Sequence, residues 1–472
     1  MKKFIFMFLL AAAVAGAFTF ALAQDTQGEE KKFVIHGEVR QRADYIDNWS
    51  DFDSDFSDSA LFFPYRARIA AEGHFSKDVI GYAEFQTFGL WGDTDPVRGR
   101  TGFTFPNIDQ NYQDNFSNAT SGTWNNNVHL YQGWIALNNI GGSKFSLKIG
   151  RQEVVKGSEM LLGDLDFYSG ISHDGMVGSF NNDSFGLDLW WTRPLQHTDT
   201  TILDPGPPEV SFDVPTHESQ NFYGGWVDFK KIPNKIGVSV YLMYFEQGQT
   251  TTNLDGFAFY TIGARANKEA EAGKNGFAWN AELAFQSGDF TIGPDINDTG
   301  DVSASAFEGM FGYNLNAGGN DHLFQIKYVM ATGNKDTADP DFDPAKDEAF
   351  HPLFQDFHMR YGLSDAFTLS DLTALSLGWN MTKKNHIVGV DYWMYELSED
   401  IVGFDGNNYS DLGSEVDAWY KFQYNPNTQI MAGLAYFMPG DVIKFNPDFE
   451  GPGSSAPTDA GMRIVTNLRL RF

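Results

Sequence analysis

The C-terminal stretch that decides the fold class is Arg463-Ile464-Val465-Thr466-Asn467-Leu468-Arg469-Leu470-Arg471-Phe472. In an extended strand, its isoleucine, leucines and phenylalanine share one face with Thr466, whereas its arginines and Asn467 occupy the other. A strand of about 9–11 residues with one apolar and one strongly polar face is typical of a membrane-spanning β-barrel. The aromatic residue at the very end of the chain is also typical of such barrels. The stretch therefore predicts the closing strand of a transmembrane barrel.

The same alternation recurs between turn signals along the whole chain. The segments that show it are Phe33–Tyr45, Phe63–Phe75, Val79–Phe88, Val128–Asn138, Ser143–Arg151, His173–Phe180, Ser184–Arg193, Asn221–Lys230, Ile236–Glu246, Ala258–Asn267, Gly276–Ser287, Ser303–Leu315, His322–Thr332, Asp371–Met381, Asn385–Tyr395, Gly413–Tyr424, Thr428–Phe437 and Met462–Phe472. We therefore predict an all-β protein, a single antiparallel transmembrane β-barrel of about 18 strands.

The connections between these segments alternate in length, as they do in bacterial barrels with short periplasmic turns and long external loops. The short connections are Ser76 to Asp78, Asn139 to Gly142, Asn181 to Asp183, Lys231 to Lys235, Thr382 to Lys384 and Asn425 to Asn427. The long ones are Gly89–Asn127, Gln152–Ser172, Pro194–Gln220, Gly333–Ser370 and Met438–Gly461. We expect the long connections to be extracellular, and the loop Gly89–Asn127 to fold inward and narrow the pore.

The N-terminus has the three parts of a secretory signal peptide. Lys2 and Lys3 precede an apolar run that ends at Phe20, and a small-residue cleavage site follows at Ala21-Leu22-Ala23. The run is short for a membrane anchor, and no basic stop-transfer flank follows it. We predict a signal peptide over residues 1–23, export through the Sec pathway, a periplasmic segment over 24–32, and the barrel over 33–472.

Composition excludes several classes of protein. The formal net charge of −29 disfavours nucleic-acid binding, which needs lysine and arginine to neutralise phosphates. The aromatic share of 15% is too high for a disordered chain. The absence of cysteine rules out disulfides, thiolate metal sites and cysteine nucleophiles. An exported, aromatic-rich chain of this kind is either a soluble β-protein or an outer-membrane barrel, and the strand pattern favours the barrel.

The polar face of each barrel strand must point into the lumen, so strand parity predicts the residues that line the pore. The basic ones are Arg40, Arg42, Arg66, Arg68, Arg265, Lys327, Lys421, Arg463, Arg469 and Arg471. The acidic ones are Glu38, Glu72, Glu282, Glu308, Asp391, Glu415 and Asp417. Because closure makes the last strand the neighbour of the first, seven of the arginines form one contiguous arc opposite an acidic wall.

Two interpretations of this arginine arc remain open. In the first, the arginines pair with lumen carboxylates such as Glu38 and Glu72 and serve to fill the barrel. In the second, they form a path for carboxylate, phosphate or sulfate groups, which a guanidinium binds with two parallel hydrogen bonds. The parity of Arg151 directs its side chain to lipid if the strand runs regularly. A bulge near Gly150, or a strand that ends before it, would return it to the barrel rim, and we interpret it as a rim residue.

The predicted external loops are acidic. The stretch from Asp295 through Asn297 to Asp301 partly resembles a calcium loop, but Ala306 stands where the loop would need its bidentate glutamate. Solvated loops joined to lipopolysaccharide by divalent cations are the favoured explanation of the acidity. We therefore expect no cofactor apart from structural Ca²⁺ or Mg²⁺ at these loops.

Several short runs resemble the alginate export family of outer-membrane barrels. They are Gly150-Arg151-Gln152-Glu153, Leu161-Leu162-Gly163-Asp164, His173-Asp174-Gly175, Ala331-Thr332-Gly333-Asn334, Phe350-His351-Pro352-Leu353-Phe354, Gly362-Leu363-Ser364-Asp365, Gly413-Ser414-Glu415-Val416-Asp417 and Phe437-Met438-Pro439-Gly440. The family more often has Arg and Phe before the Asp-Gly of the third run. The resemblance implies an 18-stranded barrel with a polar pore in the outer membrane.

Taken together, these features predict a porin that lets small anionic or hydroxylated solutes diffuse passively through an arginine-lined lumen. The alternative, implied by the resemblance, is an export pore for an acidic polysaccharide such as alginate. We expect no enzyme, because neither His173-Asp174 nor His351 has a convincing partner for catalysis. The predicted partners are outer-membrane lipid, lipopolysaccharide and small-molecule or oligosaccharide solutes, with no nucleic acid. The sequence favours neither monomer nor trimer.

Overall fold

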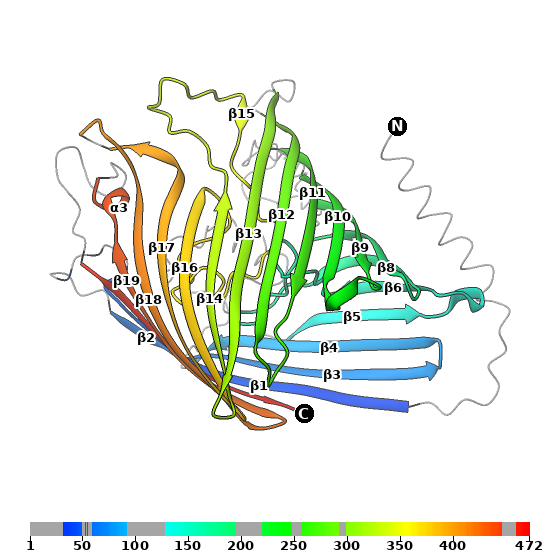
Figure 1. Ribbon diagram of the computed structural model, residues 1–472. Coiled ribbons are helices and arrows are strands. Elements are labelled where there is room, and N and C mark those ends of the chain that lie inside the picture. Colours follow the sequence, from blue (N-terminus) through cyan, green and yellow to red (C-terminus); the bar gives the residue numbers. More distant parts are fainter. Residues whose placement is uncertain are drawn as a thin grey trace, which may run out of the picture.

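A computed structural model describes residues 32–49, 52, 54, 59–91, 128–194, 220–247, 256–291, 299–403, 405–445 and 459–472. Eighteen long strands form the fold (Figure 1). They are β1 (Lys32–Asp47), β3 (Pro64–Ser76), β4 (Val79–Leu90), β5 (His129–Leu137), β6 (Phe145–Gln152), β7 (His173–Asn181), β8 (Phe185–Arg193), β9 (Gln220–Phe229), β10 (Gly237–Gln247), β11 (Phe257–Lys268), β12 (Gly276–Thr291), β13 (Thr299–Ala317), β14 (Asn320–Ala331), β16 (Leu372–Lys383), β17 (His386–Val402), β18 (Asn408–Asn425), β19 (Thr428–Pro439) and β20 (Gly461–Arg471). Two short strands, β2 (Ala60–Phe62) and β15 (Lys346–Asp347), are accessory.

The long strands close into a barrel. Each pairs antiparallel with its neighbours in the chain, and β20 pairs with β1, for example Arg469 opposite Arg40. The last residue completes the seam, because the backbone N–H of Gly37 donates to the carbonyl of Phe472 at 2.7 Å. Closure leaves no unpaired edge among the described long strands, which a protein surrounded by lipid requires. The predicted fold class, a barrel of 18 antiparallel strands with short turns at one end, is confirmed.

The strands agree with their predicted segments most closely at the periplasmic end and less closely at the external end. The structure extends β17 to Val402, seven residues past the predicted Tyr395, and begins β18 at Asn408 rather than Gly413. Backbone pairing continues there, with Val402 opposite Asn408. Side-chain alternation stops because this part of the hairpin stands outside the lipid, where no apolar face is needed. Alternation therefore marks the membrane span and not the whole strand.

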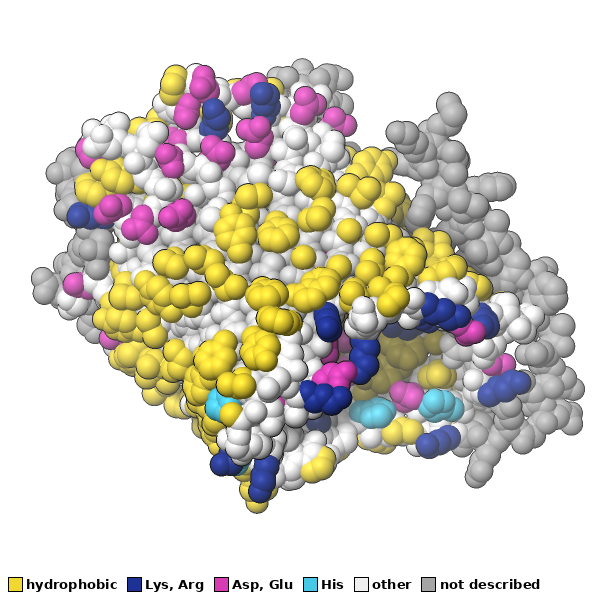
Figure 2. All heavy atoms as spheres, viewed as in Figure 1, with side chains coloured by type: hydrophobic (Ala, Val, Ile, Leu, Met, Phe, Trp, Pro, Cys, Tyr) yellow, Lys and Arg dark blue, Asp and Glu magenta, His cyan; other side chains and the backbone are white. Residues whose placement is uncertain are grey.

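The outer face carries the apolar half of each strand. In β20, Ile464 and Leu468 remain 39% and 46% exposed, whereas Arg463 and Val465, on either side of Ile464, are 1% and 0% exposed. Figure 2 shows the resulting hydrophobic band, with acidic side chains gathered above it at the end of the barrel that carries β15. No helix among the described residues is long and apolar enough to cross a membrane. The helix α3 (Asp441–Phe445) spans five residues.

Candidate functional site

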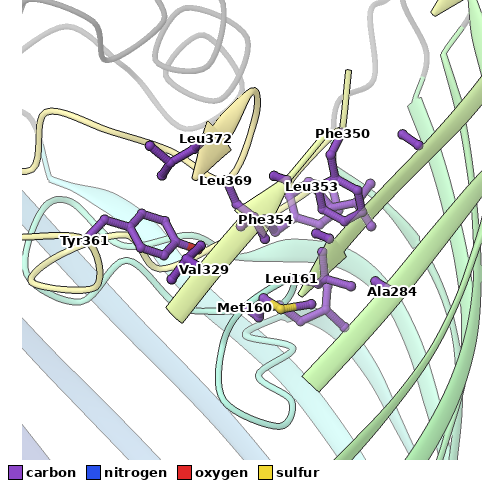
Figure 3. Packing of buried hydrophobic residues seen from close by; sticks show 14 of the residues in the cluster. Met160, Leu161, Ala284, Val329, Phe350, Leu353, Phe354, Tyr361, Leu369 and Leu372 are labelled. Carbon is purple, nitrogen blue, oxygen red and sulfur yellow. The ribbon is translucent and has the colours of Figure 1, made fainter. Parts of the chain in front are cut away.

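Two of the predicted external loops fold into the barrel. We call residues 153–172, between β6 and β7, the first lumen segment, and residues 348–371, before β16, the second lumen segment. Met160, Leu161, Phe354 and Leu369 in these segments are 0–2% exposed and form the apolar core of the lumen (Figure 3). This core packs on inward-facing side chains of the wall, with the rings of Phe354 and Phe222 5.0 Å apart. Apolar burial inside the barrel is what holds the segments there.

The two lumen segments are bonded to each other. The backbone N–H of Gly163 donates to the carbonyl of Phe354 at 2.7 Å, and the N–H of Phe354 donates to the carbonyl of Leu161 at 3.0 Å. A side chain at Gly163 would meet Asp356 at 2.6 Å, so the close approach requires glycine there. The segments therefore act as one body that fills part of the lumen.

Five guanidiniums surround a single carboxylate of the first lumen segment. This arginine cluster consists of Arg40, Arg66, Arg68, Arg469 and Arg471, whose nitrogens lie 3.0, 2.6, 3.5, 3.0 and 3.3 Å from the carboxylate of Asp166. Burial alone would raise the pKa of Asp166, but Arg66, Arg40 and Arg68 outweigh it and hold the pKa of this carboxyl well below its usual range. Asp166 is therefore ionised at neutral pH.

Two further carboxylates share the arginine cluster. Arg66 donates to Glu38 through Nε at 3.0 Å, and Arg471 Nε lies 3.0 Å from the other oxygen of Glu38. Glu153 lies 3.9 Å from Arg68. Five guanidiniums thus face three carboxylates, which leaves the cluster two positive charges in excess.

The arginines of this cluster differ in accessibility. The side chains of Arg40 and Arg66 are 2% and 0% exposed, and both also donate to backbone carbonyls around Asp166. The side chains of Arg469 and Arg471 remain 22% and 55% exposed. The buried pair anchors the first lumen segment, and the open pair faces the remaining space.

Arg42 and Arg463 form a separate, charge-balanced group. Arg42 pairs with Asp44 and stacks 3.9 Å above the ring of Phe167. Arg463 lies 2.7 Å from Asp365 and also donates to the carbonyls of Leu363 and Ser364. Arg42 thus packs on the first lumen segment, and Arg463 holds the second against the seam between β20 and β1.

Most carboxylates of the predicted acidic wall form hydrogen bonds or ion pairs with the lumen segments. Glu415 accepts from the backbone N–H of Ser364 at 2.9 Å, and Asp417 accepts from that of Leu363 at 3.0 Å. Glu308 lies 2.8 Å from Arg360 of the second segment. Glu282 accepts from the hydroxyl of Ser158 in the first segment at 2.6 Å and lies 3.6 Å from Arg265.

The contacts of the remaining predicted residues that follow are made within the barrel wall. Asp391 accepts from the indole N–H of Trp419 at 3.0 Å and lies 4.0 Å from Lys327. Lys421 lies 5.2 Å above the ring of Trp419. Glu72 lies 2.5 Å from His74 and 3.7 Å from His36, toward the periplasmic end of β3.

One cluster of carboxylates was not predicted from the sequence, because its residues belong to loops without periodicity. Carboxylate oxygens of Glu159, Asp164 and Asp356 lie within 4.8 Å of one another, where the two lumen segments meet. Burial, together with Glu159 and Asp164, raises the pKa of Asp356 to about 7. A cavity of about 370 Å³ borders this cluster and is lined by Glu159, Asp356 and Lys327, among others.

Other predictions lie in or beside parts of the chain that the structure does not describe. The signal peptide, most of the loop Gly89–Asn127, and residues Asp295 and Asn297 of the calcium candidate fall outside the described residues. Asp301, the third residue of that candidate, belongs to β13 and pairs with Asp289. These statements therefore stay predictions.

The two histidines considered as catalytic both pack on aromatic rings. His173 points inward and packs on Phe354 with ring centroids 4.6 Å apart, while Asp174 lies on the opposite face of β7. His351 lies 2.8 Å from Asp347 and packs on the ring of Phe259. Adjacent positions in a strand point to opposite faces, so His173 and Asp174 do not act together.

The closed barrel, its apolar belt and its charged, partly filled lumen define a porin-like channel of the Gram-negative outer membrane. The family model described as alginate export matches residues 91–452, and the chain belongs to that family. Among curated proteins, none matches the chain in sequence.

Solved outer-membrane proteins of Pseudomonas aeruginosa share the fold at low sequence identity. OccK9 (OpdG) superposes with a TM-score of 0.54 at 10% identity, over 93% of this chain and 99% of that one. OccK8 (OprE) gives 0.52 at 11% identity, over 93% and 98%. OpdK, solved with vanillate, gives 0.51 at 10% identity, over 93% and 99%. These likenesses establish the architecture.

Proposed function

We propose that this barrel is a passive channel selective for small anionic solutes, among them hydroxylated acids. The observation that carries the proposal is the binding of Asp166 by five guanidiniums. Asp166 belongs to the chain itself, so the lumen already contains a set of guanidiniums that binds a carboxylate. A solute carboxylate, phosphate or sulfate would find donors of the same kind beside it.

The exposed members of the arginine cluster supply the contact surface for the solute. Arg469 and Arg471 are accessible, and the cluster keeps its two excess positive charges after its carboxylates are counted. A charged surface in a narrow, low-dielectric passage concentrates ions of opposite sign. Anions are therefore favoured beside Arg469 and Arg471, while Arg40 and Arg66 hold the lumen segment in place.

Family membership favours a second candidate, the export of an acidic polysaccharide such as alginate. The same arginines would serve the uronate groups of a polymer. Passage of a chain of sugars needs a continuous wide lumen, however, and both lumen segments are anchored to the wall, the first through Arg66 and the second through Asp417 and Glu415. Export would require these segments to leave their places, which small-solute diffusion does not.

The proposed channel needs no catalysis and no resident cofactor, and we propose that the chain is not an enzyme. Structural Ca²⁺ or Mg²⁺ at the external acidic loops remains part of the proposal, as does contact with lipopolysaccharide. Its solutes are small molecules or oligosaccharides, and the pathway runs through the lumen beside β20.

Reversal potentials in planar bilayers under a salt gradient test the selectivity. The purified wild-type protein is expected to prefer anions, and the double variant Arg469→Gln/Arg471→Gln is expected to lose most of that preference. The matched control is Arg151→Gln, which removes the same kind of charge from the outer face of the barrel and should leave selectivity unchanged.

Two outcomes would contradict the proposal. One is cation preference in the wild type, and the other is anion preference that survives in the double variant. For export, a liposome assay with oligouronates of increasing length separates the candidates. Flux that falls off sharply beyond a few sugars supports the diffusion channel, whereas flux independent of length supports the exporter.

A further inference from the structure

Three charged residues form a row across the outer face of the barrel on β6, β7 and β8. Strand pairing places Arg151 opposite Asp174, and Asp174 opposite Arg193. Arg151 donates to both carboxylate oxygens of Asp174, at 2.9 and 2.7 Å. No ion pair of Arg193 is found within the described part of the chain. The row carries one positive charge in excess.

The row faces outward and not into the lumen. Its neighbours of opposite parity, Gln152 and His173, are 0% and 1% exposed inside the barrel, whereas Ile149, which shares the parity of Arg151, is 38% exposed. β6 passes through Gly150 at φ +129 and continues to Gln152, so the side chain of Arg151 stays on the outer face. The pairing of β5 with β6 is regular through Arg151, so no bulge turns this side chain inward, and β6 ends one residue later at Gln152.

Aromatic side chains on the outer face indicate where the row lies along the membrane normal. Trp191 lies opposite Tyr223, Tyr223 opposite Tyr244, and Tyr244 opposite Tyr260, all facing outward. Such girdles lie at the boundary between hydrocarbon and headgroups. Arg193 follows Trp191 by two residues toward the extracellular end of β8, which places the charged row in the headgroup layer of the outer leaflet.

The row is a basic exception on an acidic rim. Outward side chains just above the lipid band on other strands include Glu246, Asp289 and Glu396. Acidic side chains repel anionic headgroups or need a cation between them, whereas two arginines bind phosphate oxygens directly. Asp174 fixes the guanidinium of Arg151 by its two hydrogen bonds, and it makes no such bond to Arg193 among the contacts of the described residues.

We propose that Arg151 and Arg193 form a binding site for a phosphate group of lipid A, the glycolipid of the outer leaflet. The acyl chains of this lipid would lie along the apolar outer side chains of β8 and β9 below the site, such as Leu189 and Val227. The headgroup phosphate would bridge the two guanidiniums across Asp174. This inference rests on the orientation of the barrel and not on the selectivity of its lumen.

Native mass spectrometry of the full chain, released from nanodiscs, tests the site. The nanodiscs contain phosphatidylcholine with a small fraction of diphosphorylated lipid A, dephosphorylated lipid A or phosphatidylglycerol. Wild type is expected to retain diphosphorylated lipid A, and Arg151→Gln/Arg193→Gln is expected to retain it at least about tenfold less, because both charge-assisted contacts to the phosphate are lost. Asp174→Asn, which removes the competing carboxylate, is expected to retain it more strongly.

The control is Lys144→Gln/Lys235→Gln, which removes two exposed charges from periplasmic turns and should leave lipid A retention unchanged. Equal retention by wild type and the Arg151/Arg193 variant overturns the site, as does equal retention of the dephosphorylated lipid. Stronger retention of phosphatidylglycerol would mean a general phosphate site and would overturn the assignment to lipid A. Ion selectivity of the Arg151/Arg193 variant should match wild type, so this inference and the proposed function fail separately.

Discussion

The guanidinium of Arg66 lies 2.6 Å from the carboxylate of Asp166, which follows it by 100 residues in the chain. Both groups are largely shielded from water, and the side chain of Arg66 is fully buried. This contact joins the wall of the barrel to the segment that fills it. An ion pair of this kind is costly to break from one side, because the partner is left buried without compensation.

Replacing Arg66 by Gln should therefore release the first lumen segment from the wall. We expect a larger single-channel conductance and a loss of about 3–5 kcal/mol in the stability of the docked segment. Conductance in planar bilayers and protease cleavage between Glu153 and Ser172 provide the two measurements. Arg471→Gln, at a more exposed member of the same cluster, is the control and should change selectivity with little change in conductance.

The contact between the two lumen segments can be tested at Gly163. A larger residue such as Val would collide with Asp356, whose backbone N and Cβ both lie 2.6 Å from the position of an added Cβ. The variant Gly163→Val should separate the segments and raise the frequency of open-state fluctuations in single-channel recordings. Gly276→Val, where an added Cβ meets nothing within 4 Å, should behave as wild type. An unchanged recording for Gly163→Val would show that the segments do not restrict the pore together.

The carboxylate cluster should make the packing of the lumen segments depend on pH. The pKa of Asp356 is raised to about 7, above the value of about 3.9 in an unfolded chain. The folded state therefore holds its proton more tightly, and the stabilisation is complete below about pH 4 and lost as pH rises through about 7. Glu159, Asp164 and Arg360 are the charged groups that contribute to this shift.

Urea unfolding midpoints between pH 4.5 and 8 measure this effect. Wild type is expected to lose stability across that range, and Asp356→Asn is expected to show a flatter profile because its amide cannot ionise. Asp336→Asn, in the external loop, is the control and should retain the wild-type slope. Identical slopes for wild type and Asp356→Asn would contradict the account.

The position of Gly150 in β6 should not tolerate a side chain. This residue adopts φ +129 in β6, and an added Cβ would collide with the carbonyl of Gly133 on β5. We expect Gly150→Ala to destabilise the barrel by about 1–3 kcal/mol. The measurement is the heat-dependent shift of the folded band in gel electrophoresis, with Gly276→Ala as the control. Wild-type heat resistance in Gly150→Ala would show that β5 and β6 can separate at no cost.

The strands of the barrel wall could be predicted from the sequence, whereas the two segments that fill the lumen could not. Both results have one physical reason. A strand that spans lipid must alternate in polarity, so residues such as Ile464 and Arg469 reveal which way they face. A segment inside the lumen has no such constraint, and Asp166 looks like any other loop aspartate. Its partners Arg66 and Arg471 lie 100 and 305 residues away, separations that no local pattern encodes.

The same reason explains why the predicted arginines could be placed in the lumen but not divided into buried and exposed members. Parity placed Arg40 and Arg469 in the same arc, and strand pairing sets them opposite each other. That Arg40 is buried as an anchor while Arg469 stays open depends on the first lumen segment, whose inward course the sequence did not indicate. Under the proposed function, the interpretation of the arc as filler applies to Arg40 and Arg66, and its interpretation as an anion path applies to Arg469 and Arg471.

The arginine cluster also bears on how the barrel is assembled. Its members come from β1, β3 and β20, the strands on either side of the seam, so closing the seam gathers five guanidiniums around Glu38, the carboxylate that β1 supplies to them. One carboxylate leaves four of the five positive charges unbalanced, and like charges repel at these distances unless further counter-charges are present. We infer that the first lumen segment must arrive as β20 docks, and that Asp166→Asn should accumulate an unsealed intermediate detectable by its sensitivity to protease. Closure of the barrel and docking of the first lumen segment are then one step of biogenesis, in which Asp166 supplies the counter-charge for the arginines at the seam.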